Sequence, residues 1–198
     1  FDGYRIQMKI DDGNVTLRTR KGLDWTEKFS AIAKKAEKLP NAIIDGEIVA
    51  LDHEGHPSFA SLQAALSDGK TDNLSFFAFD LLFEGGEDLR SLPLSERKQR
   101  LRDFLNGKRK RNLGTIHYVE HFESNGSAIM ESARALSLEG IVSKKLAAPY
   151  HSGRSDNWTK AKVRAGHEVV IGGWKSNGGK FRSLMVGVPK NGHRACVG

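Results

Sequence analysis

The sequence predicts an α+β protein with antiparallel sheets flanked by helices, followed by the first strands of another, all-β unit. Three observations support this prediction. Apolar and polar residues alternate from Tyr4 to Ile10, which is the period of a half-buried strand. Apolar residues from Trp25 to Leu39 recur at helical spacing. Beyond about Gly166 the chain changes to short apolar runs separated by Gly- and Asn-rich turns.

The first part of the chain contains the signals of a hairpin and of a capped helix. Asp12-Gly13 is a turn signal, and the alternation returns from Val15 to Thr19, so a second strand should pair with the first. Asp24-Trp25-Thr26-Glu27 has the pattern of a capping box, which predicts a helix that begins there and ends at Pro40.

The rest of the chain continues to alternate between strands and helices. Further strands are predicted at residues 43–51, 75–83, 115–119, 140–145 and 158–163, with helices at 58–66, from a cap at Ser95 through Leu105, and at 127–136. Short strands at 167–174, at 181–188 and from 194 onward are typical of a small antiparallel barrel. We therefore expect two domains, residues 1–164 and residues 165–198, and we expect residues 165–198 to be only part of their domain.

Composition excludes several classes of protein. Hydrophobic residues make up 38% of the 198 and charged residues 28%, which excludes collagen-like and disordered chains. The sequence has no run of roughly 18 apolar residues and no signal-peptide pattern, so a membrane protein is not expected. The single cysteine, Cys196, cannot form an internal disulfide and indicates the cytosol or nucleus. The net charge of +7 favours a polyanionic partner, nucleic acid before a membrane.

Charged residues stand in four predicted strands that we otherwise expect to be buried. They are Asp45 and Glu47, Asp80 after Phe79, Glu139 at the start of its strand, and Lys160 and Lys162. A carboxylate in a buried strand is costly unless it is paired or binds a ligand. Lys160 and Lys162 point to one face of a strand, and two neighbouring ammonium groups repel unless a polyanion lies between them. A nucleotide phosphate chain is such an anion. Solvated charges on edge strands are the alternative interpretation.

The same residues lie in short motifs that resemble those of covalent nucleotidyltransferases, chiefly ATP-dependent DNA ligases. Phe1-Asp2-Gly3-Tyr4-Arg5 is similar to the end of the family's K-x-D-G-x-R motif, and Arg18-Thr19-Arg20-Lys21-Gly22 is similar to its next basic element. The later motifs are matched in the family's order by Asp45-Gly46-Glu47-Ile48, Phe79-Asp80-Leu81-Leu82, Glu139-Gly140-Ile141-Val142-Ser143-Lys144 and Trp158-Thr159-Lys160-Ala161-Lys162. Each match is short, but their order makes the set specific.

The sequence between the motifs resembles bacterial multidomain end-joining ligases, on residues 86–98 and 138–155. The resemblance implies a nucleotidyltransferase (adenylation) domain over residues 1–164 and the start of an OB-fold β-barrel over residues 165–198. Such enzymes act with Ku and can carry polymerase and phosphoesterase modules, and no such module is visible in this sequence.

One departure from the family's pattern concerns its nucleophile. The nucleophilic lysine of the family would stand immediately before Phe1 and is absent from this chain, as is the family's last motif beyond the barrel. Two interpretations compete: a chain shortened at both ends, or a modified lysine that was dropped from the sequence. We favour the modified lysine, because adenylation would make it a non-standard residue.

The resemblance implies ligation in three steps and gives the residues their roles. The lysine attacks the α-phosphate of ATP to form lysyl-AMP, AMP passes to the 5′-phosphate at a DNA nick, and the 3′-hydroxyl displaces it. Lys160, Lys162 and Glu139 are the expected catalytic residues, the lysines neutralising the α-phosphate and the departing pyrophosphate. Phe79 would stack on adenine. Glu47 would hold the ribose hydroxyls or help to position a metal, and Glu139 would lie near Mg²⁺ or Mn²⁺. Further phosphate contacts are expected from Arg5, Arg20 and Lys144.

Three functions are compatible with these residues. The first is an ATP-dependent DNA ligase that acts as a monomer on nicked or broken duplex DNA, in the bacterial cytoplasm at the nucleoid and away from membranes. The second is an RNA ligase or a GTP-using capping enzyme, because the motifs are shared. The third is a non-catalytic nucleic-acid-binding module, which the missing lysine favours if the chain is taken literally.

Overall fold

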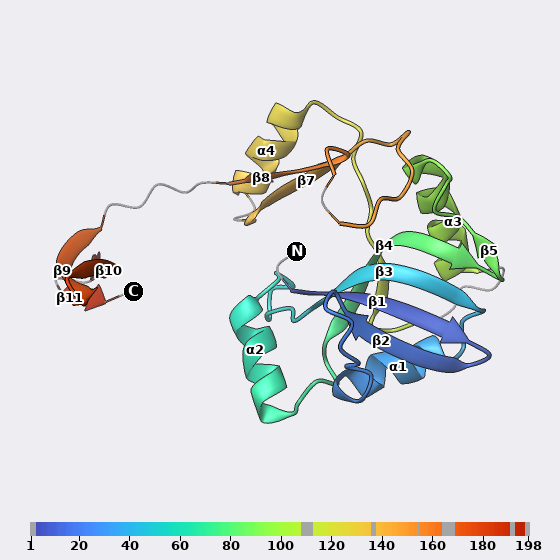
Figure 1. Ribbon diagram of the computed structural model, residues 1–198, viewed down its shortest axis with the longest axis horizontal. Helices are drawn as coiled ribbons and strands as arrows, with labels where there is room; N and C mark the ends of the chain where they lie inside the picture. Colours follow the sequence, from blue (N-terminus) through green and yellow to red (C-terminus); the bar gives the residue numbers. More distant parts are fainter. Residues whose placement is uncertain are drawn as a thin grey trace. The chain divides into compact units, whose positions relative to one another are not determined.

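The computed structural model describes residues 3–107, 113–135, 138–153, 155–163, 169–190 and 193–196. The chain divides into two compact units, Phe1–Val163 and Arg164–Gly198, each of which is described by itself (Figure 1). Strands and helices alternate along the first unit and strands alone form the second, so the predicted α+β class is confirmed. Within the described residues, every helix is too short or too polar to span a lipid bilayer.

A six-stranded sheet forms the centre of the first unit. Its strands follow the order β2-β1-β3-β4-β5, and β6 pairs in parallel with β4, whereas the other neighbours are antiparallel. The alternation along β1 buries Ile6, Met8 and Ile10 in the core, as the sequence predicts. The strands are β1 (Tyr4–Asp11), β2 (Asn14–Thr19), β3 (Ala42–Val49), β4 (Ser75–Glu84), β5 (Glu87–Asp88) and β6 (Ile116–Tyr118).

Helices pack against this sheet and share its core. α1 contacts β2 and β6, and α3 contacts β4 and β6. Phe29, Ile32 and Leu101 are fully buried in one cluster with the apolar residues of the strands. The helical elements are the 3₁₀ turn η1 (Glu27–Phe29), α1 (Ser30–Ala36), α2 (Phe59–Asp68), α3 (Leu94–Asn106) and α4 (Gly126–Ala135).

The predicted capping box before α1 is wrong. The carboxylate of Asp24 accepts hydrogen bonds from the backbone N–H and the hydroxyl of Thr26, and helical structure begins only at Glu27, in the 3₁₀ turn. Thr26 Oγ1 accepts a hydrogen bond from the backbone N–H of Leu17, so the segment is fastened to β2. Ser58, in contrast, caps α2, because its side chain accepts a hydrogen bond from the backbone N–H of Ser61, and the helix lies where the sequence predicts one.

The predicted cap at Ser95 is also wrong, because α3 begins at Leu94 and Pro93 occupies its N-cap. The backbone N–H groups of Leu94 and Ser95 donate to the carbonyls of Ala148 and Leu146. These distant carbonyls satisfy donors that a side-chain cap would otherwise serve. A tertiary contact therefore sets this helix start.

A separate two-stranded sheet carries the last motifs of the first unit. β7 (Gly140–Lys144) pairs antiparallel with β8 (Trp158–Lys162), and α4 packs against β7. We expected these strands to be buried, which is wrong: both are exposed or half-buried along their length. A sheet of two strands cannot bury both of its faces when one helix covers it. β3 and β4 are mostly buried, as expected.

The second unit is a three-stranded antiparallel sheet with the order β11-β10-β9. Its strands are β9 (Val170–Asn177), β10 (Lys180–Lys190) and β11 (His193–Cys196), so the three short strands expected here are present with shifted ends. The expected start of the first of them, His167, lies outside the described residues.

Gly46 allows the ring of Phe76 to lie against β3. A Cβ at residue 46 would be 2.3 Å from Cζ of Phe76, a fully buried ring. We expect Gly46→Ala to lower the free energy of unfolding by roughly 1–3 kcal/mol, because the ring must shift within a packed core. Urea unfolding measures this change. Gly126→Ala is the matched control, since a Cβ there meets nothing within 4 Å. Equal losses in both variants would contradict the steric explanation.

Candidate nucleotide-binding site

A β-bulge brings three motif residues together at the centre of the sheet. In the pairing of β3 with β4, Gly46 lies opposite Ala78 and Asp45 opposite Asp80, so that Phe79 is the additional residue. A bulge sets two residues of one strand against one residue of its partner and re-aims their side chains. Phe79 and Asp80, although consecutive, therefore both stand beside Asp45.

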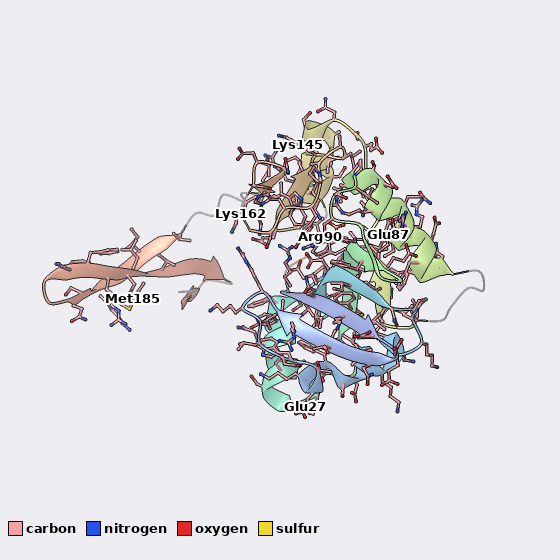
Figure 2. All side chains as sticks on the ribbon, turned by 45° about the vertical axis from the view of Figure 1, so that its right-hand side comes forward. Glu27, Glu87, Arg90, Lys145, Lys162 and Met185 are labelled. Atoms are coloured by element: carbon pink, nitrogen blue, oxygen red, sulfur yellow. The ribbon has the colours of Figure 1, made fainter. Side chains whose placement is uncertain are left out.

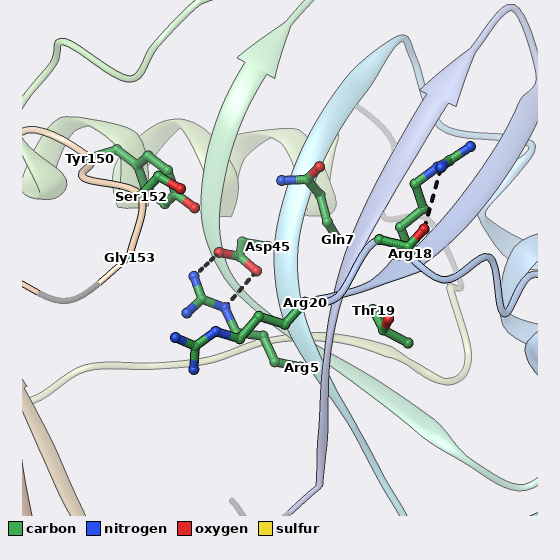
Figure 3. A pocket seen from close by; sticks show the side chains of 10 residues that line it. Arg5, Gln7, Arg18, Thr19, Arg20, Asp45, Tyr150, Ser152 and Gly153 are labelled. Carbon is green, nitrogen blue, oxygen red and sulfur yellow. Dashed lines mark hydrogen bonds and ion pairs between the residues drawn. The ribbon is translucent and has the colours of Figure 1, made fainter.

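Arg5 and Asp45 form a bidentate ion pair across β1 and β3 (Figure 3). Nε of Arg5 donates to Oδ1 of Asp45 at 3.1 Å, and Nη2 donates to Oδ2. The Asp45 side chain is 4% exposed and the Arg5 side chain 36%, so the guanidinium reaches from a buried carboxylate toward solvent. Burial raises the pKa of Asp45, and the hydrogen bonds from Arg5 act in the opposite direction. Glu47 is the residue directly opposite Arg5 in the strand register.

A second ion pair, between Arg97 on α3 and Asp80, is completely buried, at 1% and 0% exposure. Nε and Nη2 of Arg97 donate to the two carboxylate oxygens at 2.7 and 3.0 Å. Nη1 donates to the carbonyls of Leu92 at 2.5 Å and of Ala148 at 3.4 Å. Arg97 thus joins the bulge to the connection between β7 and β8.

Two aromatic rings and two cations meet above the bulge, and we call Phe79, Trp158, Arg5 and Lys144 the aromatic–cation cluster. The rings of Phe79 and Trp158 are edge-on, with centroids 6.0 Å apart. Nζ of Lys144 lies 4.3 Å from the Phe79 centroid and 3.8 Å from that of Trp158. Cζ of Arg5 lies 5.7 and 5.2 Å from the same centroids. These distances are typical of cation–π interactions.

Burial lowers the pKa of Lys144 to about 8. The nearby positive charges of Lys98 and Arg5 act in the same direction, whereas the carboxylates of Asp80 and Asp45 oppose the shift. The ammonium group therefore loses its proton much more readily than an ordinary lysine.

A polar cavity of about 360 Å³ opens beside the Arg5–Asp45 pair (Figure 3). Three guanidinium groups line it, those of Arg5, Arg18 and Arg20, and Asp45 is the one carboxylate among its lining residues in the described part of the chain. A cavity with this excess of positive charge favours an anionic ligand such as phosphate. Hydroxyl-bearing and amide side chains complete the polar lining, from Gln7, Thr19, Tyr150 and Ser152.

Glu139 lies between Lys160 and Lys162, the two lysines that would repel each other without an anion between them. Its Oε1 is 3.1 Å from Nζ of Lys160 and 3.2 Å from Nζ of Lys162, a residue labelled in Figure 2. Hydrogen bonds from Lys160 and then Lys162 lower the pKa of Glu139. The negative charge between the two lysines therefore comes from the Glu139 carboxylate. Gly140 permits this close pairing, because a Cβ there would be 2.3 Å from the carbonyl oxygen of Ala161.

The predicted site residues thus form two groups. Arg5, Phe79 and Lys144 share the aromatic–cation cluster, and Arg20 shares the cavity with Arg5. Glu139, Lys160 and Lys162 form the other group, at the opposite end of the β7–β8 hairpin from the Lys144–Trp158 pair. Phe1 and Asp2 lie outside the described residues.

Sequence reasoning gave no role to Trp158, Tyr150, Asp80 or Arg97. The position of Trp158 on the same strand face as Lys160 was the available signal. The pairing of Arg97 with Asp80, 17 residues away, left no local pattern in the sequence.

Carboxylate groups are the donors that this site could offer to a divalent cation. Within the described residues, His, Cys, Asp and Glu side chains form no group of three that could hold a metal ion. Glu139 supplies carboxylate oxygens, which suit Mg²⁺ or Mn²⁺, although two ammonium groups contact it. These residues fit a cation that takes most of its ligands from phosphate and water, as Mg²⁺ commonly does.

Comparison with known proteins agrees with these features. A family model described as "ATP dependent DNA ligase domain" matches residues 1–162. The chain is 38% identical over 186 residues to the multifunctional non-homologous end joining protein LigD of Pseudomonas aeruginosa, covering 93% of this chain and 22% of that protein. It is 33% identical over 196 residues to LigD of Mycolicibacterium smegmatis, covering 96% and 24%. The chain therefore spans about a quarter of the length of these curated relatives.

Solved structures give the same result for the fold. The chain is similar to "mycobacterial DNA ligase D complexed with ATP and MES", with a TM-score of 0.74, 32% identity, and coverage of 100% of this chain and 63% of that chain. It is also similar to the ligase domain of LigD from M. tuberculosis, with a TM-score of 0.71, 31% identity, and coverage of 100% and 64%. The nucleotidyltransferase fold expected from the motifs is confirmed.

Removing Arg97 should strongly destabilise the first unit, because Asp80 would stay buried without a counterion. We expect Arg97→Met to cost roughly 3–5 kcal/mol of unfolding free energy, measured by urea unfolding. The double variant Arg97→Met/Asp80→Leu removes both charges and should recover much of that loss. A double variant as unstable as the single one would show that the bonds of Arg97 to backbone carbonyls carry the effect.

The lowered pKa of Lys144 predicts a pH-dependent contribution to stability. Between about pH 8, its pKa in the folded protein, and its ordinary value of 10.5, the unfolded chain holds a proton that the folded chain has lost. The unfolding free energy of the natural protein should therefore rise, relative to Lys144→Met, as the pH increases from 7.5 to about 9.5. Urea unfolding across this range tests the prediction, with exposed Lys145→Met as control. A constant difference would contradict it.

Proposed function

Because this chain belongs to the family of ATP-dependent DNA ligase domains, of the type found in bacterial LigD proteins, we propose that it seals breaks in duplex DNA through lysyl-AMP and DNA-adenylate intermediates. The observation that carries this proposal is the aromatic–cation cluster beside an arginine-lined cavity. A nucleotide needs a flat apolar surface for its base and fixed cations for its phosphates. Phe79, with Arg5, Lys144 and Arg20, supplies both.

The proposed nucleophile is the lysine that the family places immediately before Phe1. Its amine must be neutral to attack, and neighbouring cations or loss of solvent favour the neutral form. The amine nitrogen forms a bond to the α-phosphorus of ATP, while the bond from that phosphorus to the bridging oxygen breaks and pyrophosphate leaves. Arg5, on the strand that follows, is held in a fixed orientation by Asp45 and would contact the nucleotide phosphate.

Charge neutralisation is the proposed task of Lys160 and Lys162. Negative charge on the α-phosphate and on the departing pyrophosphate would be met by their ammonium groups, which Glu139 already orients. Glu139 would hold Mg²⁺ or Mn²⁺, and Glu47 would bind the ribose hydroxyls or assist with the metal. Such a cation, when bound, neutralises phosphate charge.

The remaining steps act on DNA. AMP passes from the lysine to the 5′-phosphate at a nick, and the 3′-hydroxyl then displaces AMP to close the strand. The net charge of +7 favours a nicked or broken duplex as partner.

We further propose that residues 1–164 are the adenylation domain and residues 165–198 the start of an OB-fold. In this proposal the protein works as a monomer in the bacterial cytoplasm at the nucleoid, with Ku and with polymerase or phosphoesterase modules as partners.

Transfer of labelled nucleotide tests the proposal. The protein, with its natural residues upstream of Phe1 and freed of bound AMP, should take label from α-labelled ATP and Mg²⁺ onto the lysine before Phe1. Lys162→Ala and Glu139→Ala should each lower the labelling rate by about 10²–10³-fold, the range for losing one electrostatic contact in a transition state. Lys34→Ala, an exposed lysine on α1, is the control and should label normally.

The other outcomes of this experiment assign the alternatives. Label from GTP would indicate a capping enzyme, and sealing of RNA in place of DNA by the labelled protein would indicate an RNA ligase. Absence of label from both nucleotides would leave a non-catalytic nucleic-acid-binding module. Near-normal labelling of Lys162→Ala or Glu139→Ala would remove that residue from the proposed catalytic set.

A further inference from the structure

Trp158 contacts three residues to which the proposed function gives a part in nucleotide binding. We infer that Trp158 is a positioning residue for the nucleotide: its indole fixes the ring of Phe79 and the two cations that lie over both rings. This inference rests on the proposed function and adds to it a residue that touches the site from the β7–β8 hairpin.

The indole of Trp158 and the ring of Phe79 both contact Arg5 and Lys144. Trp158 begins β8 and lies opposite Lys144, the last residue of β7, in the strand register. Its ring plane is inclined by 78° to that of Phe79, an edge-on arrangement favoured by aromatic quadrupoles. Lys144 and Arg5 each lie closer to the indole centroid than to the phenyl centroid, at 3.8 against 4.3 Å and 5.2 against 5.7 Å. The indole is therefore the nearer π partner of both cations.

Electrostatics favour an aromatic ring at this position. Lys144 and Arg5 carry like charges that repel, and burial further disfavours the ammonium form of Lys144. Asp45 compensates Arg5 through two hydrogen bonds, whereas the carboxylates of Asp80 and Asp45 favour the Lys144 ammonium group without a hydrogen bond or ion pair to it among the described residues. The indole face is the strongest cation–π acceptor among the side chains. Without the indole, Lys144 and the Phe79 ring each lose a contact that fixes their position. Nucleotide binding must then order both side chains.

The position of Trp158 also predicts which step depends on it. In the proposed function Phe79 and Lys144 bind the nucleotide, and Lys144 lies at one end of the β7–β8 hairpin. Lys160, Lys162 and Glu139 lie toward the other end of that hairpin. Loss of the indole should therefore weaken nucleotide binding and change the chemical step little. A merely structural residue would instead lower the amount of folded protein without altering the ATP dependence of the remainder.

The experiment measures the rate of self-labelling against ATP concentration for the natural protein, Trp158→Leu and Trp158→Phe. In Trp158→Leu, the ATP concentration for half-maximal rate should rise about tenfold, from the loss of a cation–π and an aromatic contact, with the maximal rate within about threefold of normal. Trp158→Phe keeps an aromatic face and should recover most of the loss.

Trp25 offers a matched control in the same chain. Its ring is edge-on to Tyr4, with centroids 5.2 Å apart at 69°, and Nζ of Lys28 lies 4.5 Å from its centroid. Trp25→Leu therefore removes the same kinds of contact from residues outside the aromatic–cation cluster. It should lower the unfolding temperature while leaving the ATP dependence unchanged.

Each contrary outcome has a distinct meaning. A lower maximal rate in Trp158→Leu with an unchanged half-maximal ATP concentration would overturn the inference, and so would an equal rise in Trp25→Leu. If the natural protein takes no label, the proposed function fails, and equilibrium dialysis with ATP alone then tests the inference. Binding of ATP to Trp158→Leu about tenfold weaker than to the natural protein would support it, and equal binding would overturn it.

Discussion

The buried ion pair between Arg97 and Asp80 is the interaction on which the arrangement of the site depends. Asp80 belongs to the bulge of β4, and Arg97 comes from α3. The remaining N–H groups of Arg97 reach the carbonyls of Leu92 and Ala148, the latter in the connection between β7 and β8. One guanidinium thus binds the bulge, the start of α3 and the hairpin connection. Since Phe79 precedes Asp80 in the bulge and Trp158 follows this connection, their meeting relies on the same pair.

Every motif carboxylate whose contacts are described is matched by cations. Asp45 pairs with Arg5, Asp80 with Arg97, and Glu139 with Lys160 and Lys162, as the ion-pair distances show. Asp45 and Asp80 are buried in strands, where a carboxylate is tolerable only with such a partner. The same pairs orient guanidinium and ammonium groups before any phosphate arrives, which lowers the reorganisation that a charged transition state would otherwise require.

Residues of the central sheet and of the β7–β8 hairpin meet in the site. The aromatic–cation cluster joins the sheet to the β7–β8 hairpin, because Arg5 and Phe79 come from β1 and β4 whereas Lys144 and Trp158 come from one end of the hairpin. The triad of Glu139, Lys160 and Lys162 lies toward the other end of the same half-exposed hairpin. A rigid sheet suits recognition of a base. The connection of the half-exposed hairpin is fastened by backbone hydrogen bonds, from Leu94 and Ser95 to the carbonyls of Ala148 and Leu146 and from Tyr150 to that of Arg90. The position of Lys144 and Trp158 over the sheet therefore depends on contacts of the hairpin with neighbouring segments.

The sequence by itself determined the α+β class, the strands of the central sheet other than β5, the place of α2 and the family motifs, because period-two alternation and local turn chemistry are short-range properties. Only the tertiary structure decided the start of α3, where distant carbonyls of Leu146 and Ala148 replace a cap. It also decided the exposure of β7 and β8, the partner of Asp80, and the place of Trp158 beside Phe79. Each of these depends on which surfaces meet after the chain has folded, and contacts between residues far apart in sequence leave no local pattern to read.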